Sequence, residues 1–415
     1  MSAVDGGAVR TPDGARMLDE LMNAFGKPGM RMAGIGRAGA VVFGLTVMSG
    51  GAQVSPQLMP RETDSTSMWW AEGFPRFLPE APWIRCIQTG TYAFVLDTEK
   101  LTVPHFGPLE DGGDWQALEP AELAVSVTVG GKTHRCVEGA EWGRFSGPRL
   151  VTSGRFQQRA DVTGLVLVAG DGGKLDAEAR FETVAWPDRL ALVLAVRPKS
   201  ENWPDATMAV SLTSAMGALS LSKQWQVPDG ETWGKGEWKQ VALTMNPANF
   251  EAGETASPLV VSAVDPAKGS RWSVRYDPDM MCHRIDISGA TPIAPPGGKL
   301  PSNDAMERIK LVLENPTSGE QVARLMLEKD RGGFKGRLGS AITGVSACLR
   351  DSDGFPTGIP VQISKNWHNR PEGGVYSGSW FKGISQLRLP ANSKTELEFV
   401  VTNGHWGGVG AASHA

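Results

Sequence analysis

The chain has 415 residues, of which 21% are charged, and its formal net charge is −4 with no long run of one sign. This length predicts two or three domains, or one large β architecture with a smaller companion. Because the sequence has no run of basic residues, it excludes nucleic acid as an expected partner.

Residues 1–52 are predicted to be an N-terminal extension with a segment like a signal peptide. Basic Arg31 and Arg37 precede a short apolar stretch, residues 38–48, and small residues follow it. This order is typical of export, and the stretch is too short and glycine-rich for a good membrane span. We therefore expect a secreted, periplasmic or cell-surface protein with no membrane span in the mature chain. Three alternatives stay open: translation beginning near Met30, an anchor with a cytoplasmic tail, or a strand of the folded domain.

Residues 53–290 are predicted to form a large β domain. In residues 175–183, apolar and charged side chains alternate, which predicts a strand with one face in the core and the other toward water or a ligand. Turn-prone residues 186–189 follow, and the almost wholly apolar run 190–196 completes a predicted hairpin. Further strands are expected at residues 91–96, 123–129, 162–168, 208–212, 238–245, 259–264 and 271–276.

With 51 glycines and 28 prolines, the chain has too many turn signals for a helical protein. The predicted class is all-β: a large antiparallel β-sandwich or supersandwich, then a linker at residues 291–303, then a smaller immunoglobulin-like sandwich at residues 304–415. A hairpin of residues 307–313 and 321–327 is expected to open the second sandwich. A helix is the alternative for residues 321–327. Because the chain stops on a Gly/Ala/His stretch, we expect it to be truncated at its C-terminus.

The four cysteines have no spacing typical of a zinc or redox motif. In an exported protein they allow three disulfide pairings, but each has an apolar neighbour and also fits a buried free thiol. No phosphate-binding loop, dinucleotide fingerprint or paired-histidine zinc motif occurs, so we predict no cofactor and no metal. The four residues are Cys86, Cys136, Cys282 and Cys348.

Three of the six histidines lie from His368 onward, which makes this region the first candidate site. Strand alternation predicts that Gln362, Asn366 and His368 share one face, beside a cation and an aromatic ring. Stacking of a sugar ring on an indole, with hydroxyls bound by polar groups, uses this combination. The predicted catalytic residues are His368 and His405 as acid or base, with Asn366 and Lys365 stabilising negative charge. The predicted substrate-binding residues are Gln362, Trp367, Trp406, Trp233 and Trp238.

Fourteen tryptophans against three tyrosines also suit a sugar-stacking surface, although core packing explains most tryptophans. Glu178 and Glu182 share one strand face, but no spacing marks a carboxylate pair for glycoside hydrolysis. The segment Asp351-Ser352-Asp353-Gly354 predicts a turn in which the aspartate caps its own backbone; calcium binding is the alternative.

These patterns favour an exported carbohydrate-active protein that binds glycan, with glycoside hydrolase or polysaccharide lyase activity if the histidine site is catalytic. The alternative is a non-catalytic cell-surface or scaffold β-sandwich protein that binds glycan or protein, with any catalytic domain absent or downstream. The expected partner in the first case is a carbohydrate or polysaccharide.

Overall fold

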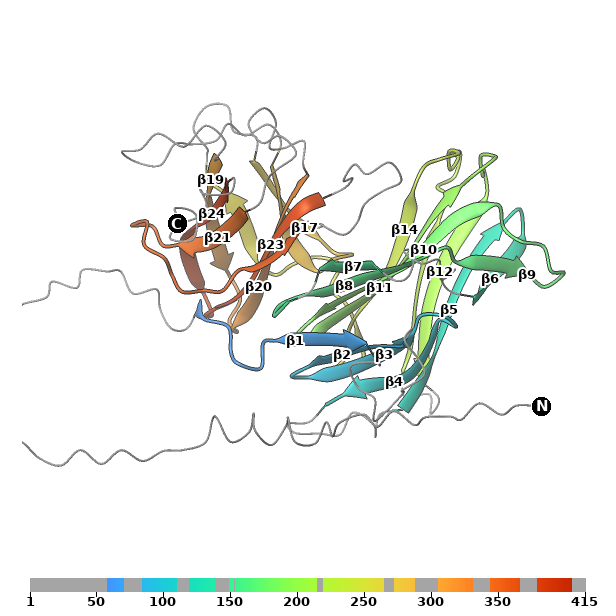
Figure 1. The fold of residues 1–415 in the computed structure, drawn as a ribbon, viewed down its shortest axis with the longest axis horizontal. Helices are drawn as coiled ribbons and strands as arrows, with labels where there is room; N and C mark the ends of the chain where they lie inside the picture. The colour runs from blue at the N-terminus through green and yellow to red at the C-terminus, as the bar shows by residue number, and fades with distance from the viewer. Residues whose placement is uncertain are drawn as a thin grey trace, which may run out of the picture. The chain divides into compact units, whose positions relative to one another are not determined.

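Strands and turns make up the described part of the computed structural model, which contains no helix, as the all-β prediction required (Figure 1). It follows that none of its segments is a helix that could cross a membrane. All described residues belong to one compact unit, Gly51–Ala415. The structure describes residues 58–70, 84–109, 119–138, 149–152, 154–214, 219–264, 272–287, 305–330, 344–365 and 379–404.

The first sandwich has a nine-stranded and a six-stranded antiparallel sheet. The nine-stranded sheet contains β1 (Thr66–Trp70), β2 (Ile84–Thr89), β3 (Tyr92–Asp97), β4 (Thr102–Pro108), β5 (Glu119–Val129), β6 (Lys132–Glu138), β9 (Val166–Ala169), β12 (Ala206–Ser214) and β13 (Ser220–Gln226). The six-stranded sheet runs in the order β15 (Glu251–Ala252), β14 (Lys239–Asn246), β11 (Arg189–Pro198), β10 (Ala177–Trp186), β8 (Gln158–Thr163), β7 (Arg149–Thr152).

The second sandwich has a four-stranded and a five-stranded sheet. The four-stranded sheet runs β16 (Val260–Ala263), β19 (Ala305–Asn315), β24 (Ser393–Gly404), β21 (Gly344–Arg350). The five-stranded sheet runs β17 (Trp272–Asp277), β18 (Cys282–Ile287), β20 (Gln321–Asp330), β23 (Ser379–Leu389), β22 (Gln362–Lys365). Its β18–β20 pair is parallel.

The hairpin predicted around residues 186–189 is confirmed, since β10 and β11 pair from Ala177↔Pro198 to Trp186↔Arg189. Its two faces lie in different cores. Phe181 and Leu192 belong to the core of the first sandwich, while Val184 and Val193 pack with residues of the five-stranded sheet such as Met326. Burial on both faces explains why β11 is apolar at successive positions.

Two local predictions were wrong. The single strand expected at residues 162–168 is divided into β8 and β9, because Gly164 has a φ of 76°, in the left-handed region that interrupts a strand. The hairpin expected from residues 307–327 does not form, since β19 pairs with β16 and β24 whereas β20 pairs with β18 and β23. The helical alternative for residues 321–327 is also excluded by β20.

The sheets divide the chain between β15 and β16, so β16, β17 and β18 belong by hydrogen bonding to the second sandwich. The predicted linker, residues 291–303, and the predicted N-terminal extension, residues 1–52, lie outside the described residues.

Cys86 is a free and buried thiol, so the four cysteines are not joined in two disulfides.

Gln362 connects the two sandwiches through a buried side-chain amide. Its Oε1 accepts hydrogen bonds from the backbone N–H groups of Phe156 at 2.8 Å and Gln157 at 2.9 Å, and its Nε2 donates to the Gln157 carbonyl at 2.8 Å. Gly154 allows this approach, because a Cβ there would lie 2.5 Å from the Gln362 Cδ. The predicted substrate-binding role of Gln362 is therefore corrected to a structural one.

We expect the substitution Gln362→Ala to lower the free energy of unfolding by about 3 kcal/mol, because it leaves two buried N–H groups without an acceptor. Urea unfolding followed by tryptophan fluorescence measures this change. Gln224→Ala, at an exposed position of β13, is the matched control and should change stability by less than about 0.5 kcal/mol. Equal effects of the two substitutions would contradict the structural role.

Candidate functional site

The histidine and tryptophan cluster predicted near the C-terminus is not tested by the structure. Asn366, Trp367, His368, His405 and Trp406 lie outside the described residues, as does the side chain of Lys365. The strands that lead into the two segments do not pair, because β22 pairs with β23 whereas β24 pairs with β19 and β21. These two strands therefore belong to different sheets.

Trp233 is a core residue. It is 1% exposed, and its ring makes edge contacts with Trp203 and Trp225 at centroid distances of 4.9 and 5.2 Å. Its indole N–H donates to the Glu237 carbonyl at 2.8 Å. Because its faces and its donor are both occupied, the predicted sugar-stacking role of Trp233 is corrected to that of an anchor for the loop before β14.

Trp238 is the tryptophan of this loop that reaches the surface, with 38% of its area exposed. The loop holds it in place, since Gly236 donates a backbone hydrogen bond to the Pro198 carbonyl at 2.9 Å. Two guanidinium groups lie over its ring, that of Arg180 at 4.8 Å and that of Arg197 at 5.0 Å from the centroid. Cation–π contacts of this kind fix the ring before any ligand arrives.

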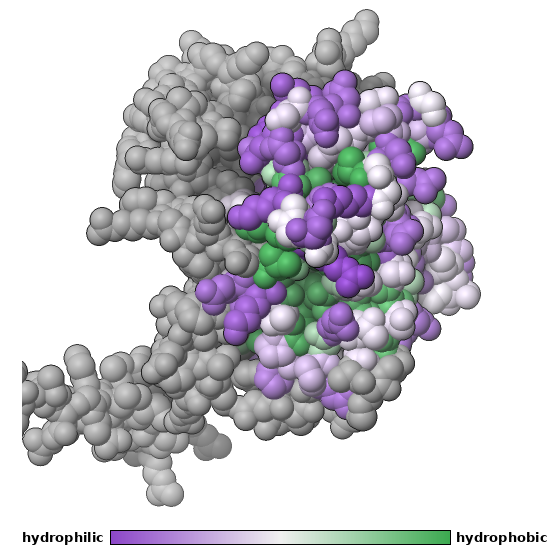
Figure 2. All heavy atoms as spheres, turned by 90° about the vertical axis from the view of Figure 1, so that its right-hand side faces the viewer, coloured by the Kyte–Doolittle hydropathy of each residue, from purple (hydrophilic) through white to green (hydrophobic). Residues whose placement is uncertain are grey.

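A groove of about 540 Å³ opens beside this ring, and we call it the Trp238 groove. The partly exposed Val166 and Leu175 contribute apolar surface, while its polar lining comes from Lys174, Glu178, Arg180 and Lys199. Figure 2 views the molecule from the side on which β6 and β9 lie in Figure 1. On this face, hydrophobic residues form groups among hydrophilic ones. An exposed indole beside apolar surface and convergent polar groups suits a sugar.

The two glutamates of β10 differ in environment. Glu178 forms an ion pair with Arg197, its cross-strand partner. Glu182 is 5% exposed and binds Arg159 through two hydrogen bonds. Burial raises the pKa of Glu182, but the charge and hydrogen bond of Arg159 outweigh burial and lower this pKa overall. Glu182 is thus an ionised structural group rather than a proton donor.

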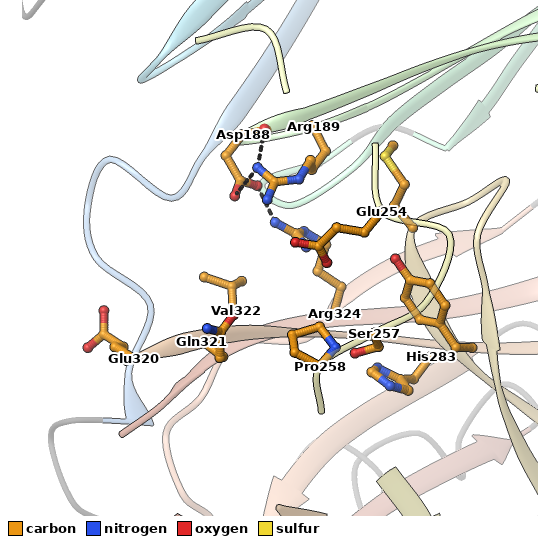
Figure 3. Close-up of a pocket in the computed structure, with 12 residues that line it drawn as sticks. Asp188, Arg189, Glu254, Ser257, Pro258, His283, Glu320, Gln321, Val322 and Arg324 are labelled. Atoms are coloured by element: carbon orange, nitrogen blue, oxygen red, sulfur yellow. Dashed lines mark hydrogen bonds and ion pairs between the residues drawn. The ribbon is translucent and has the colours of Figure 1, made fainter. Parts of the chain in front are cut away.

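A second, smaller cavity of about 220 Å³ lies between the β10–β11 turn and strands β17, β18 and β20; we call it the Asp188 cavity. Figure 3 shows Arg324 reaching from β20 toward Asp188 and Arg189. Asp188 binds both guanidinium groups. Burial raises the pKa of Asp188, but the charges of Arg324 and Arg189 outweigh it and lower this pKa. Asp188 is therefore ionised and neutralises one of the two guanidinium charges.

His283 and Tyr276 form another wall of the Asp188 cavity. They are cross-strand partners with ring centroids 5.3 Å apart. Burial lowers the pKa of His283 from 6.5 to about 4 and raises the pKa of Tyr276 to about 12. Both side chains are therefore neutral near pH 7 and act as polar walls.

The Asp351 turn matches its prediction. Asp351 Oδ1 accepts from the backbone N–H groups of Asp353 at 3.0 Å and Phe355 at 2.8 Å, and Gly354 has a φ of 87°. Within the described ranges, no three histidine, cysteine or acidic residues gather as metal ligands.

No protein-family model matches the chain, and a search of curated proteins finds no match. Among solved structures, a protein provisionally named aldose 1-epimerase from Escherichia coli K12 aligns at 10% identity and a TM-score of 0.17, covering 76% of this chain and 96% of its own. A galactose mutarotase related enzyme from Lactobacillus acidophilus aligns at 10% identity and a TM-score of 0.19, covering 77% and 97%. Likeness this low indicates nothing about function.

The shifted pKa of His283 predicts a pH-dependent stability. Between pH 6.5 and about 4 the unfolded chain binds a proton at His283 that the folded chain excludes. Stability is therefore complete above about pH 6.5 and falls by about 3 kcal/mol toward pH 4 through this group. We expect His283→Phe to flatten the dependence of urea-unfolding free energy on pH across this window. An unchanged slope in the variant would contradict the burial of a neutral imidazole.

Proposed function

We propose that the protein is an exported glycan-binding protein that holds a sugar ring on Trp238. The observation that carries this proposal is an exposed indole, fixed by Arg180 and Arg197, at the wall of a groove with apolar and charged lining. The CH face of a pyranose stacks on such a ring, and the convergent polar groups bind its hydroxyls. The export signal in residues 1–52 stays a prediction.

The Trp238 groove is favoured over the Asp188 cavity for a polymeric ligand. Its volume, about 540 Å³ against about 220 Å³, leaves room for more than one sugar ring. It also has an exposed aromatic surface in Trp238, whereas the partly buried Tyr276 of the Asp188 cavity packs on His283.

We expect Trp238→Ala to weaken glycan binding by about tenfold or more, because it removes the stacking surface. Affinity gel electrophoresis with a panel of soluble neutral and acidic polysaccharides identifies the ligand, and titration calorimetry then measures the affinity. Phe355→Ala, at a 52% exposed aromatic residue of the second sandwich, is the control and should bind like the unaltered protein. Binding of no polysaccharide, or equal binding by the Trp238 variant, would refute the proposal.

Catalysis is a separate part of the proposal and depends on the predicted residues His368 and His405. If the bound glycan is cleaved, separate substitutions of each histidine by alanine should remove turnover while binding through Trp238 persists. Release of reducing or unsaturated ends from the bound polysaccharide measures this turnover. Binding without product release by the unaltered protein supports the non-catalytic alternative.

A further inference from the structure

Cations outnumber carboxylates around the Trp238 groove. Its lining includes Lys174, Arg180 and Lys199 but one acidic residue, Glu178. Glu178 is already neutralised by its ion pair with Arg197. The neighbouring Glu237 on the loop is likewise paired with Lys239, at 2.5 Å. The lining therefore carries an excess of positive charge within a chain whose formal net charge is −4.

The three lining cations have no carboxylate at ion-pair distance among the described residues. Lys174 and Lys199 are exposed. Arg180 contributes to the lowered pKa of Glu182, but Glu182 is bound through both oxygens by Arg159. The charges of the lining are thus available to a ligand.

Arg180 is the best positioned of these cations. Its guanidinium carbon lies 4.8 Å from the centroid of the Trp238 ring, and the residue is partly exposed in the groove lining. The planar guanidinium pairs well with carboxylate or sulfate oxygens, and here it lies over the ring on which the sugar is proposed to stack.

We propose that the Trp238 groove selects acidic glycans, with Arg180 binding the anionic group of the sugar that stacks on Trp238. Lys174 and Lys199 strengthen the selection through longer-range attraction, which weakens as salt is added. The anionic group is a uronic acid carboxylate or a sulfate ester, since both present oxygens that a guanidinium binds. This inference rests on the proposed glycan binding and specifies its substrate class.

Pairs of polysaccharides that differ only in charge test the selection. Polygalacturonate and its carboxyl-reduced form address the carboxylate, and chondroitin sulfate and its desulfated form address the sulfate. We expect at least one acidic member to bind about tenfold or more tightly than its partner. Arg180→Gln should bring that ratio close to one, and Trp238→Ala should weaken binding to both members.

Two further variants control for folding and for general surface charge. Arg275→Gln alters an arginine of β17, 54% exposed and paired with Asp286, and should leave the ratio unchanged. A Lys174→Gln, Lys199→Gln double variant changes two exposed side chains and should lower the ratio even if Arg180→Gln does not fold. Unfolding midpoints of all variants identify any that are misfolded.

The outcomes separate the two proposals. Equal affinity for the more and the less charged member of each pair, with both weakened by Trp238→Ala, overturns the acidic selection and leaves glycan binding intact. A ratio that falls equally in the Arg180 and Arg275 variants also overturns it, because general surface charge then accounts for the preference. Binding of no polysaccharide, or binding that does not depend on Trp238, overturns the proposed function itself.

Discussion

The β10–β11 hairpin is buried on both of its faces, and the rest of the molecule depends on this constraint. One face supplies Phe181, Leu192 and Leu194 to the core between the sheets of the first sandwich. The other face supplies Val184, Ala191 and Val193 to a second cluster with the five-stranded sheet. Each face of the hairpin removes its own apolar area from water, and each buried Å² stabilises the fold by about 25 cal/mol. The two sandwiches are therefore joined by a shared core.

The same hairpin also forms part of the Trp238 groove. The side chains that pack against the outer face of β10 cover only part of the strand, and the rest of this face lines the groove. Along β10, Trp186 and Val184 are fully buried and Glu182 is 5% exposed. Arg180 and Glu178 are partly exposed and line the groove instead. One strand face thus changes from packing surface to candidate binding surface within a few residues.

The polar groups form two sets. Those at the junction of the two sandwiches fix the fold, whereas those in the Trp238 groove remain available to a ligand. At the junction of the two sandwiches, Gln362 accepts hydrogen bonds from backbone N–H groups, and Asp188 accepts one from Arg324. Paired in this way, buried polar groups specify a geometry without offering chemistry to a ligand. In the groove, by contrast, no carboxylate of the described residues lies at ion-pair distance from Arg180, whose guanidinium lies over an exposed ring. That difference is why the groove, and not the junction, is the stronger candidate site.

Local sequence patterns are sufficient to predict the all-β class, the β10–β11 hairpin and the Asp351 turn, because alternation, an apolar run and turn chemistry are local properties of the chain. They also indicate that the charged face of β10 meets water or a ligand. Tertiary packing, by contrast, buries Trp233 while it leaves Trp238 exposed, and it brings Gln362 to a backbone N–H group 205 residues away. No basic run in the sequence marks the groove, because folding, not sequence adjacency, brings the charges of Lys174, Arg180 and Lys199 together. Sheet membership likewise separates β19 from β20. Local patterns report which face of a strand is buried, whereas its partners are fixed by non-local packing.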